Sequence, residues 1–205
     1  MPPANPARRR ALADAAITLL ADQGAHGLTH RSAERLAGMP PGTASNYFRN
    51  REALLVAAAE RISELHMADM DAATSGGGPA PGTPEGRWGP WSADDLAELL
   101  ADSLWTAATA LRDRYLAVFE LQSEARRHPA LSEVLTALWD SALAVTRGLH
   151  AAMGTPVPQA GVQTLATLYN GALFALVSRP ADRLDRAEVG ELAAAMVRGA
   201  VGPPR

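Results

Sequence analysis

Apolar side chains in this chain recur at the spacing of α-helices, and this periodicity constrains the fold more than any other feature. In residues 8–23, Leu12, Ala16 and Leu20 repeat every fourth position and form one apolar stripe. A half-buried strand is expected to alternate apolar, often β-branched, residues with polar ones. The chain shows few alternations of this kind. The sequence therefore predicts an all-α protein.

Capping and turn residues divide the chain into about nine expected helices. Thr29 and Asn50 are N-cap residues, and Gly24 is of the type that commonly ends a helix. The expected helices cover residues 8–23, 29–36, 41–48, 51–70, 92–112, 114–127, 129–153, 159–178 and 185–201.

A segment rich in Gly, Pro, Ser and Thr separates the first four helices from the five that follow. This segment, residues 71–92, has too few apolar residues to pack on its own and is expected to be a flexible linker. We therefore expect a small module at 1–50, a connecting helix at 51–70, and a helical body at 93–205.

Several classes of chemistry lack the residues they need. The chain has no cysteine, and its five histidines do not pair at helical spacing, so neither thiol chemistry nor a metal site is expected. There is no nucleophile elbow, and the glycine run at 76–78 lacks the lysine of a phosphate-binding loop. We expect no catalytic residues and no cofactor, with a helical enzyme or a helical adaptor protein as the rival classes.

Nothing in the sequence resembles a secretion signal or a membrane anchor. The basic residues at 8–10 are followed by a segment that Asp14 and Asp22 interrupt. No apolar run reaches the roughly 18–20 residues that span a bilayer. We therefore expect a cytoplasmic protein with no membrane partner.

The net charge of -3 conceals an uneven distribution of charge. Residues 1–61 hold 8 Arg and 5 acidic residues, a net of +3, whereas residues 62–205 hold 11 Arg and 17 acidic residues, a net of -6. A basic N-terminal module on an acidic body indicates that the first third of the chain meets a polyanion.

The segment 24–55, GAHGLTHRSAERLAGMPPGTASNYFRNREALL, predicts two short helices joined by a turn that contains Gly38. This is the arrangement of a helix-turn-helix, whose second helix enters the major groove of DNA. Small and apolar residues form its expected core, namely Ala33, Met39, Ala44 and Phe48. Free backbone N–H groups at 42–43 are expected to point at a phosphate.

The same segment resembles the DNA-binding domain of the TetR/AcrR family of bacterial regulators. The resemblance is carried by Leu28-Thr29-His30-Arg31, Ala37-Gly38-Met39, Gly42-Thr43, Tyr47-Phe48 and Arg51-Glu52-Ala53-Leu54. It covers about 50 residues, and the helix count of the remaining chain also fits the family. Ala33, Glu34, Ala44 and Ser45 depart from the residue types that the family commonly has at these positions.

The resemblance implies a set of residues that contact DNA. Thr29 would cap the second helix and touch phosphate, Arg31 would reach phosphate or a guanine edge, and Arg51 would clamp a phosphate. Asn46 would read a base edge, or else lie on the surface without a base contact. The full set is Thr29, His30, Arg31, Pro41, Gly42, Thr43, Ser45, Asn46, Tyr47 and Arg51.

For the helical body, the resemblance implies a ligand pocket and a dimer interface made by the last two helices. Large or polar residues of the middle helices are the pocket candidates, with plain core packing as the alternative: His66, Trp105, Phe119, Gln122, Trp139, Tyr169 and Asn170. The segment 162–177 is apolar on nearly every side, which indicates burial by both core and partner. The candidates for the interface are Leu165, Leu168, Ala172, Leu176, Leu192 and Met196.

Together, these features predict a homodimeric repressor that binds a palindromic operator in double-stranded DNA and is released by a small-molecule inducer. A transcriptional activator and a ligand-independent regulator are the alternatives within the same class.

Overall fold

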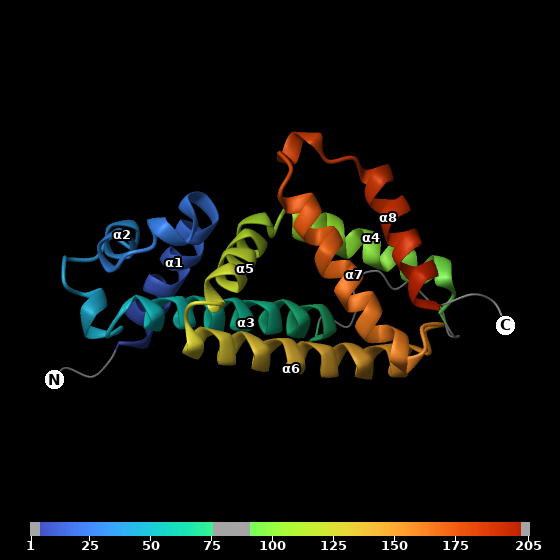
Figure 1. The fold of residues 1–205 in the computed structure, drawn as a ribbon, viewed down its shortest axis with the longest axis horizontal. Helices are drawn as coiled ribbons and strands as arrows, with labels where there is room; N and C mark the ends of the chain where they lie inside the picture. Colours follow the sequence, from blue (N-terminus) through green and yellow to red (C-terminus); the bar gives the residue numbers. More distant parts are fainter. Residues whose placement is uncertain (1–4, 76–90, 202–205) are drawn as a thin grey trace. The chain divides into compact units, whose positions relative to one another are not determined.

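The computed structural model describes residues 5–75 and 91–201, with side chains placed for 5–69 and 91–201. These residues form eight α-helices and two 3₁₀ turns, with no strand among them, so the all-α prediction is confirmed. The helices are α1 (Pro6–Gly27), α2 (His30–Leu36), α3 (Arg51–Ser75), α4 (Ala93–Ala108), α5 (Arg112–Ala125), α6 (Pro129–Met153), α7 (Gln159–Val177) and α8 (Arg186–Val201), and the turns are η1 (Ala44–Asn46) and η2 (Ala181–Arg183) (Figure 1).

Side-chain caps explain where three of the helices begin. The Thr29 hydroxyl accepts a hydrogen bond from the Ser32 N–H at 3.0 Å, and the side-chain Oδ1 of Asn50 accepts one from the Ala53 N–H at 2.9 Å. Before α4, Ser92 and Asp95 form a reciprocal capping box. Each cap satisfies a backbone donor that a helix start leaves without an intrahelical partner.

The prediction of a third helix over residues 41–48 is wrong in length and type, because the segment forms a 3₁₀ turn that covers only Ala44–Asn46. Two consecutive prolines at 40–41 lack N–H donors, and Gly42 adopts φ 86°, so a helix does not begin before Thr43. The first helix continues past the expected end to Gly27, with a kink at Gly24 (φ 65°). The helix expected to end at 70 continues to Ser75, so residues 71–75 of the expected linker are helical, and residues 76–90 lie outside the described residues.

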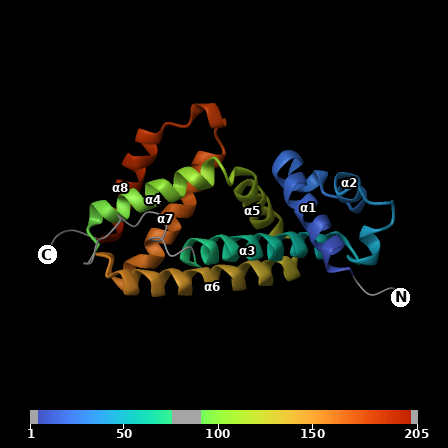
Figure 2. The same cartoon turned by 180° about the vertical axis from the view of Figure 1, so that it is seen from behind.

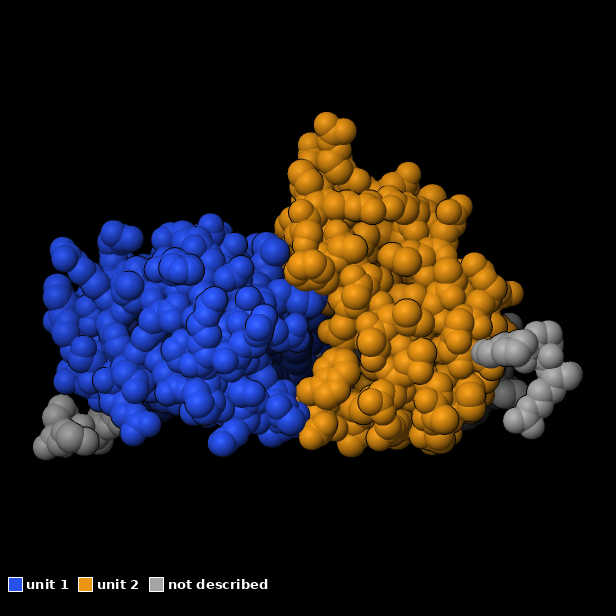
Figure 3. Space-filling model, in the orientation of Figure 1, with its two compact units in different colours: residues 1–69, 113–138 blue, residues 70–112, 139–205 orange. Residues whose placement is uncertain are grey.

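The chain divides into two compact units, coloured separately in Figure 3. The N-terminal unit comprises residues 1–69 and 113–138, and the C-terminal unit comprises residues 70–112 and 139–205. This division differs from the contiguous domains expected from the sequence. The reason is packing: Leu121 of α5 and Leu131 of α6 are fully buried in the same core as Leu20 and Leu54.

In the C-terminal unit, α4 packs against α7 and α8, and these two helices pack against each other (Figures 1 and 2). Leu104, Leu173 and Val189 are buried in its core. Arg186, at the start of α8, donates to the Ala101 carbonyl at 3.2 Å and lies over the Trp105 ring, which fixes α8 on α4.

Within the described residues, α7 is long and apolar enough to span a membrane, which the sequence analysis did not anticipate. One such helix is weak evidence for a span, because core helices of globular proteins share this property. In this chain, α7 buries Val162, Leu165 and Leu173 within the C-terminal unit.

A glycine permits the close approach of α7 to α8. A Cβ added to Gly161 would lie 2.5 Å from the backbone oxygen of Ala200. We expect Gly161→Ala to lower the free energy of unfolding by roughly 1–3 kcal/mol, because the backbone of α8 has to move.

The matched control is Gly148→Ala on α6, where an added Cβ meets nothing within 4 Å. There the gain in helix propensity should leave stability unchanged or raise it by up to about 1 kcal/mol. Urea unfolding of both variants checks the prediction, and equal stabilities would contradict it.

Candidate functional site

The α2–η1 segment folds as a helix-turn-helix. Gly38, in the turn, has φ 64°, which lets the chain reverse after α2 at no steric cost. Ala33, Ala44 and Phe48 are buried between the two elements, and Met39 packs against them, so the core expected from the sequence is confirmed.

A buried carboxylate, which sequence reasoning did not single out as functional, anchors the recognition segment. Glu34 of α2 is buried, and its Oε1 accepts a hydrogen bond from the Ala44 N–H at 2.7 Å. A carboxylate at the first N–H groups of a helical turn is electrostatically favourable. Glu34 thus compensates for the shortness of η1. In the sequence, the only sign of this role is that Glu34 differs from the residue type that the TetR/AcrR family commonly has at this position.

Neighbouring side chains fix the recognition segment further. The His30 Nε2 lies 2.9 Å from the Phe48 carbonyl oxygen, so this nitrogen carries the proton and donates. The Thr43 N–H donates to the Pro40 oxygen at 3.2 Å, so the expectation that this N–H is free for a phosphate is wrong.

The structure separates the expected DNA contacts by exposure. Thr29, Arg31, Pro41, Gly42, Ser45 and Asn46 are exposed, whereas His30, Thr43, Tyr47 and Arg51 are partly buried. The exposed residues lie at the start of α2, in the turn that precedes η1, and in η1 itself. These are the parts of a helix-turn-helix that are expected to face DNA.

The geometry of Arg51 does not support the predicted phosphate clamp. Its Nε donates to the Leu28 oxygen at 3.2 Å, its Nη2 donates to the Ala25 oxygen, and its Nη1 lies 3.1 Å from the Glu124 carboxylate. Each guanidinium nitrogen therefore has a partner within the protein. Arg51 joins the end of α1, the start of α3 and the end of α5, and we do not propose it as a DNA contact.

Glu124 is the acidic centre of this cluster. Burial raises the pKa of its carboxyl, but the hydrogen bond and charge of Arg51, together with the charges of Arg127 and protonated His128, lower the pKa by more. The net pKa is below the ordinary value of 4.5. The contribution of Glu124 to stability is therefore present above about pH 4.5 and lost as the pH falls through its lower folded-state pKa.

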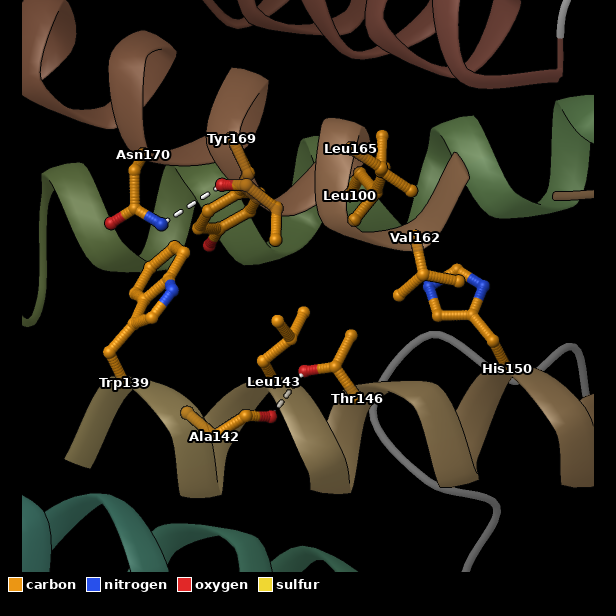
Figure 4. A pocket seen from close by; sticks show the side chains of 11 residues that line it. Leu100, Trp139, Ala142, Leu143, Thr146, His150, Val162, Leu165, Tyr169 and Asn170 are labelled. Atoms are coloured by element: carbon orange, nitrogen blue, oxygen red, sulfur yellow. Dashed lines mark hydrogen bonds between the residues drawn. The ribbon is translucent and has the colours of Figure 1, made fainter. Parts of the chain in front are cut away.

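The C-terminal unit contains a cavity of about 240 Å³ between α4, α6 and α7 (Figure 4). Three of the expected ligand residues line it, namely Trp139, Tyr169 and Asn170. The other lining residues are Leu100, Ala142, Leu143, Thr146, His150, Val162, Leu165 and Ala166. Sequence reasoning missed His150, although it lies eleven positions after Trp139 on the same face of one helix.

The remaining ligand candidates do not line this cavity. Trp105 is partly buried beneath Arg186, and Gln122 is exposed on α5. His66 and Phe119 belong to the N-terminal unit. Burial lowers the pKa of His66, and the charge of Arg114 lowers it further, while the charge of Asp69 acts in the opposite direction. The centre of the His66 ring lies 5.3 Å from the centre of the Tyr115 ring.

The structure also divides the candidates for the dimer interface. Leu165, Ala172, Leu176 and Met196 are buried within the C-terminal unit, so they are core residues and are not open to a partner. Leu168 is exposed at 41%, and Leu192 is partly buried. The sequence analysis overlooked Phe174, which is 54% exposed on the same helix as Leu168.

Two parts of the chain match known protein families. Residues 12–58 match the bacterial regulatory proteins of the tetR family, and residues 91–203 match a tetracyclin repressor-like C-terminal domain. The chain belongs to the TetR family. TetR-family proteins are transcriptional regulators with a DNA-binding helix-turn-helix, so the enzyme alternative is not supported.

Individual relatives of this TetR-family protein are similar over different extents. Over 52 residues, the chain is 44% identical to the HTH-type transcriptional regulator BetI of Rhizobium meliloti, a stretch that spans about a quarter of either protein (25% of this chain and 26% of BetI). A putative TetR-family regulator from Rhodococcus superimposes with a TM-score of 0.68 at 20% identity, covering 97% of this chain and 100% of that one. GusR of Salmonella enterica superimposes with a TM-score of 0.66 at 20% identity, covering 98% of this chain and 97% of GusR. At these identities, the two structures show a shared fold alone.

The Arg51–Glu124 pair generates a pH-dependent prediction. We expect Glu124→Gln to lower the free energy of unfolding by roughly 1–3 kcal/mol at neutral pH, because a charged hydrogen bond is lost. The difference from the unmodified protein should shrink as the pH falls below about 4.5, where Glu124 itself becomes protonated. Chemical unfolding at several pH values measures both effects, and a difference that stays constant with pH would contradict the assignment.

Proposed function

We propose that this TetR-family protein is a cytoplasmic repressor that binds a palindromic operator as a homodimer and is released by a small-molecule inducer. The single observation that carries the proposal is the exposed polar surface of α2 and η1. Arg31, Ser45 and Asn46 lie on it, over a backbone that Glu34 and His30 hold in place.

The chemistry of these side chains suits two kinds of contact with DNA. Arg31 supplies a charge for a phosphate, and Ser45 and Asn46 supply hydrogen-bonding groups for base edges in the major groove. The Glu34 bond to the Ala44 N–H is important here, because a recognition segment of one turn positions these side chains only if its backbone is fixed.

The exposed face of α7 supports the dimer. Leu168, Gly171 and Ala175 are exposed at intervals of three and four residues, and Phe174 is exposed beside them. Pairing this stripe with its copy would remove two large apolar side chains per protomer from water. Two helix-turn-helix units held in one dimer would read half-sites about one helical turn of DNA apart.

The cavity of the C-terminal unit supports the response to a ligand over the ligand-independent alternative. A ligand that binds the DNA-incompetent state better than the competent one shifts the population away from DNA. The cavity is lined largely by apolar side chains and carries a few polar groups, as small-molecule sites do.

Selection from a random double-stranded DNA library tests the proposed function. At roughly 100 mM salt, phosphate attraction alone still retains DNA, so the selection is repeated at higher salt. An inverted repeat that survives the increase is the expected result. Recovery of only sequence-independent, salt-sensitive DNA would contradict operator binding.

Two substitutions on the proposed DNA surface should differ in kind. Arg31→Ala should weaken binding to all sequences and reduce the dependence of affinity on salt, because one phosphate contact is lost. Asn46→Ala should weaken binding by roughly 1–3 kcal/mol and relax the preference at one base pair.

The matched control is Arg126→Ala, which removes an exposed arginine of the same unit at the end of α5. Titration of the selected operator and its single-base variants measures these effects. If Arg31→Ala and Arg126→Ala bind the operator equally well, Arg31 is not a DNA contact.

The dimer face generates a further prediction. Gly171→Arg should convert the dimer to a monomer at micromolar concentration, because it places a charge in the centre of the apolar stripe of α7. A Cβ at either Gly171 or Gly148 meets nothing within 4 Å, so Gly148→Arg on α6 is a matched control for folding and charge. Analytical ultracentrifugation distinguishes the two, and an unchanged dimer in Gly171→Arg would place the interface elsewhere.

A further inference from the structure

We propose that the cavity between α4, α6 and α7 selects an uncharged, elongated and largely hydrocarbon ligand that carries a neutral hydrogen-bonding group. This inference rests on the proposed ligand response and names the chemical class of the inducer. It follows from the shape of the cavity, the absence of charge in its lining, and the bonds that its polar groups already make.

The shape of the cavity follows the direction of α6. Its lining residues on that helix are Trp139, Ala142, Leu143, Thr146 and His150, which share one face over three turns. At 1.5 Å of rise per residue, Trp139 and His150 are roughly 16 Å apart along the axis. Because about 240 Å³ extends along this length, the cavity is narrow and suits a linear or singly substituted ring skeleton better than a fused ring system.

The described part of the lining carries no formal charge. Among the described residues that line the cavity, none is Asp, Glu, Lys or Arg. His150 is the one histidine among these described lining residues, and burial lowers the pKa of its imidazole, which keeps it neutral at pH 7. A carboxylate, phosphate or ammonium group placed inside the cavity would lose hydration without gaining a counter-ion from the described lining, which is unfavourable.

The polar groups of the lining are partly engaged with the protein. The Asn170 amide nitrogen donates to the Ala166 carbonyl at 2.9 Å, and the Thr146 hydroxyl donates to the Ala142 carbonyl at 2.9 Å (Figure 4). The His150 Nδ1 lies 2.7 Å from the Thr155 hydroxyl, which leaves Nε2 on the other side of the ring. Nε2 of His150 is therefore placed to bond a hydroxyl or amide at one end of the cavity, whereas Figure 4 shows the Asn170 amide oxygen directed away from Tyr169.

A series of ten-carbon probes tests the class of ligand. Calorimetry compares 1-decanol, below its aqueous solubility limit, with decanoate and decyltrimethylammonium, below their micellar concentrations, against the full-length protein at pH 7.5. We expect 1-decanol to bind at least about tenfold more tightly than either ion, since each ion would be buried without a counter-charge. Equal or tighter binding of an ion, or no saturable binding of any probe, would overturn the proposal.

A pair of variants locates the binding to the cavity. Ala142 lines the cavity, whereas Ala144 does not, and both are exposed on α6. Ala142→Trp should fill the cavity and weaken 1-decanol binding by at least about tenfold, while Ala144→Trp should leave it unchanged. Equal affinities in the two variants would overturn the assignment to this cavity.

Operator binding with each probe separates this inference from the proposed function. If 1-decanol binds as expected and the operator stays bound, the ligand class stands and the inducer response fails. If decanoate releases the operator and 1-decanol does not, the response stands and the ligand class fails.

Discussion

The guanidinium group of Arg51 is the interaction on which the arrangement of the N-terminal unit depends. It donates to backbone oxygens of Ala25 and Leu28, at the junction of α1 and α2, and pairs with Glu124 of α5. The N–H of Ala25 in turn donates to the Glu120 carboxylate at 2.9 Å. Ala25 thus has both of its backbone groups satisfied by side chains of other helices, which allows this junction to be buried. The position of α2, and with it the exposed surface of η1, follows from this junction.

The same contacts connect α5 to the helix-turn-helix. Glu120 and Glu124 of this helix hold the junction that leads into the helix-turn-helix. The chain passes from one compact unit to the other at residues 69–70 within α3, at 112–113 at the start of α5, and at 138–139 within α6. These three helices are the covalent connections between the two units.

Sequence reasoning predicted the features that depend on local chemistry. Caps at Thr29 and Asn50, the positive φ at Gly38 and the buried Phe48 follow from rules that act over a few residues. It failed where the outcome depends on residues far apart in sequence. Arg51 was expected to face DNA because nothing nearby in sequence shows that Glu124 lies beside it. Leu165 and Leu176 were expected at an interface because an apolar helix does not show which of its faces α4 and α8 cover.

Hydrogen–deuterium exchange with and without the selected operator tests most directly the claim that the α2–η1 surface reads DNA. We expect slower exchange in peptides covering residues 29–47 when operator is bound, because their backbone is held against the groove and the phosphates. The N–H of Ala44 should already exchange slowly without DNA, since Glu34 accepts its hydrogen bond. Unchanged exchange throughout residues 29–47 in a saturated DNA complex would contradict the account.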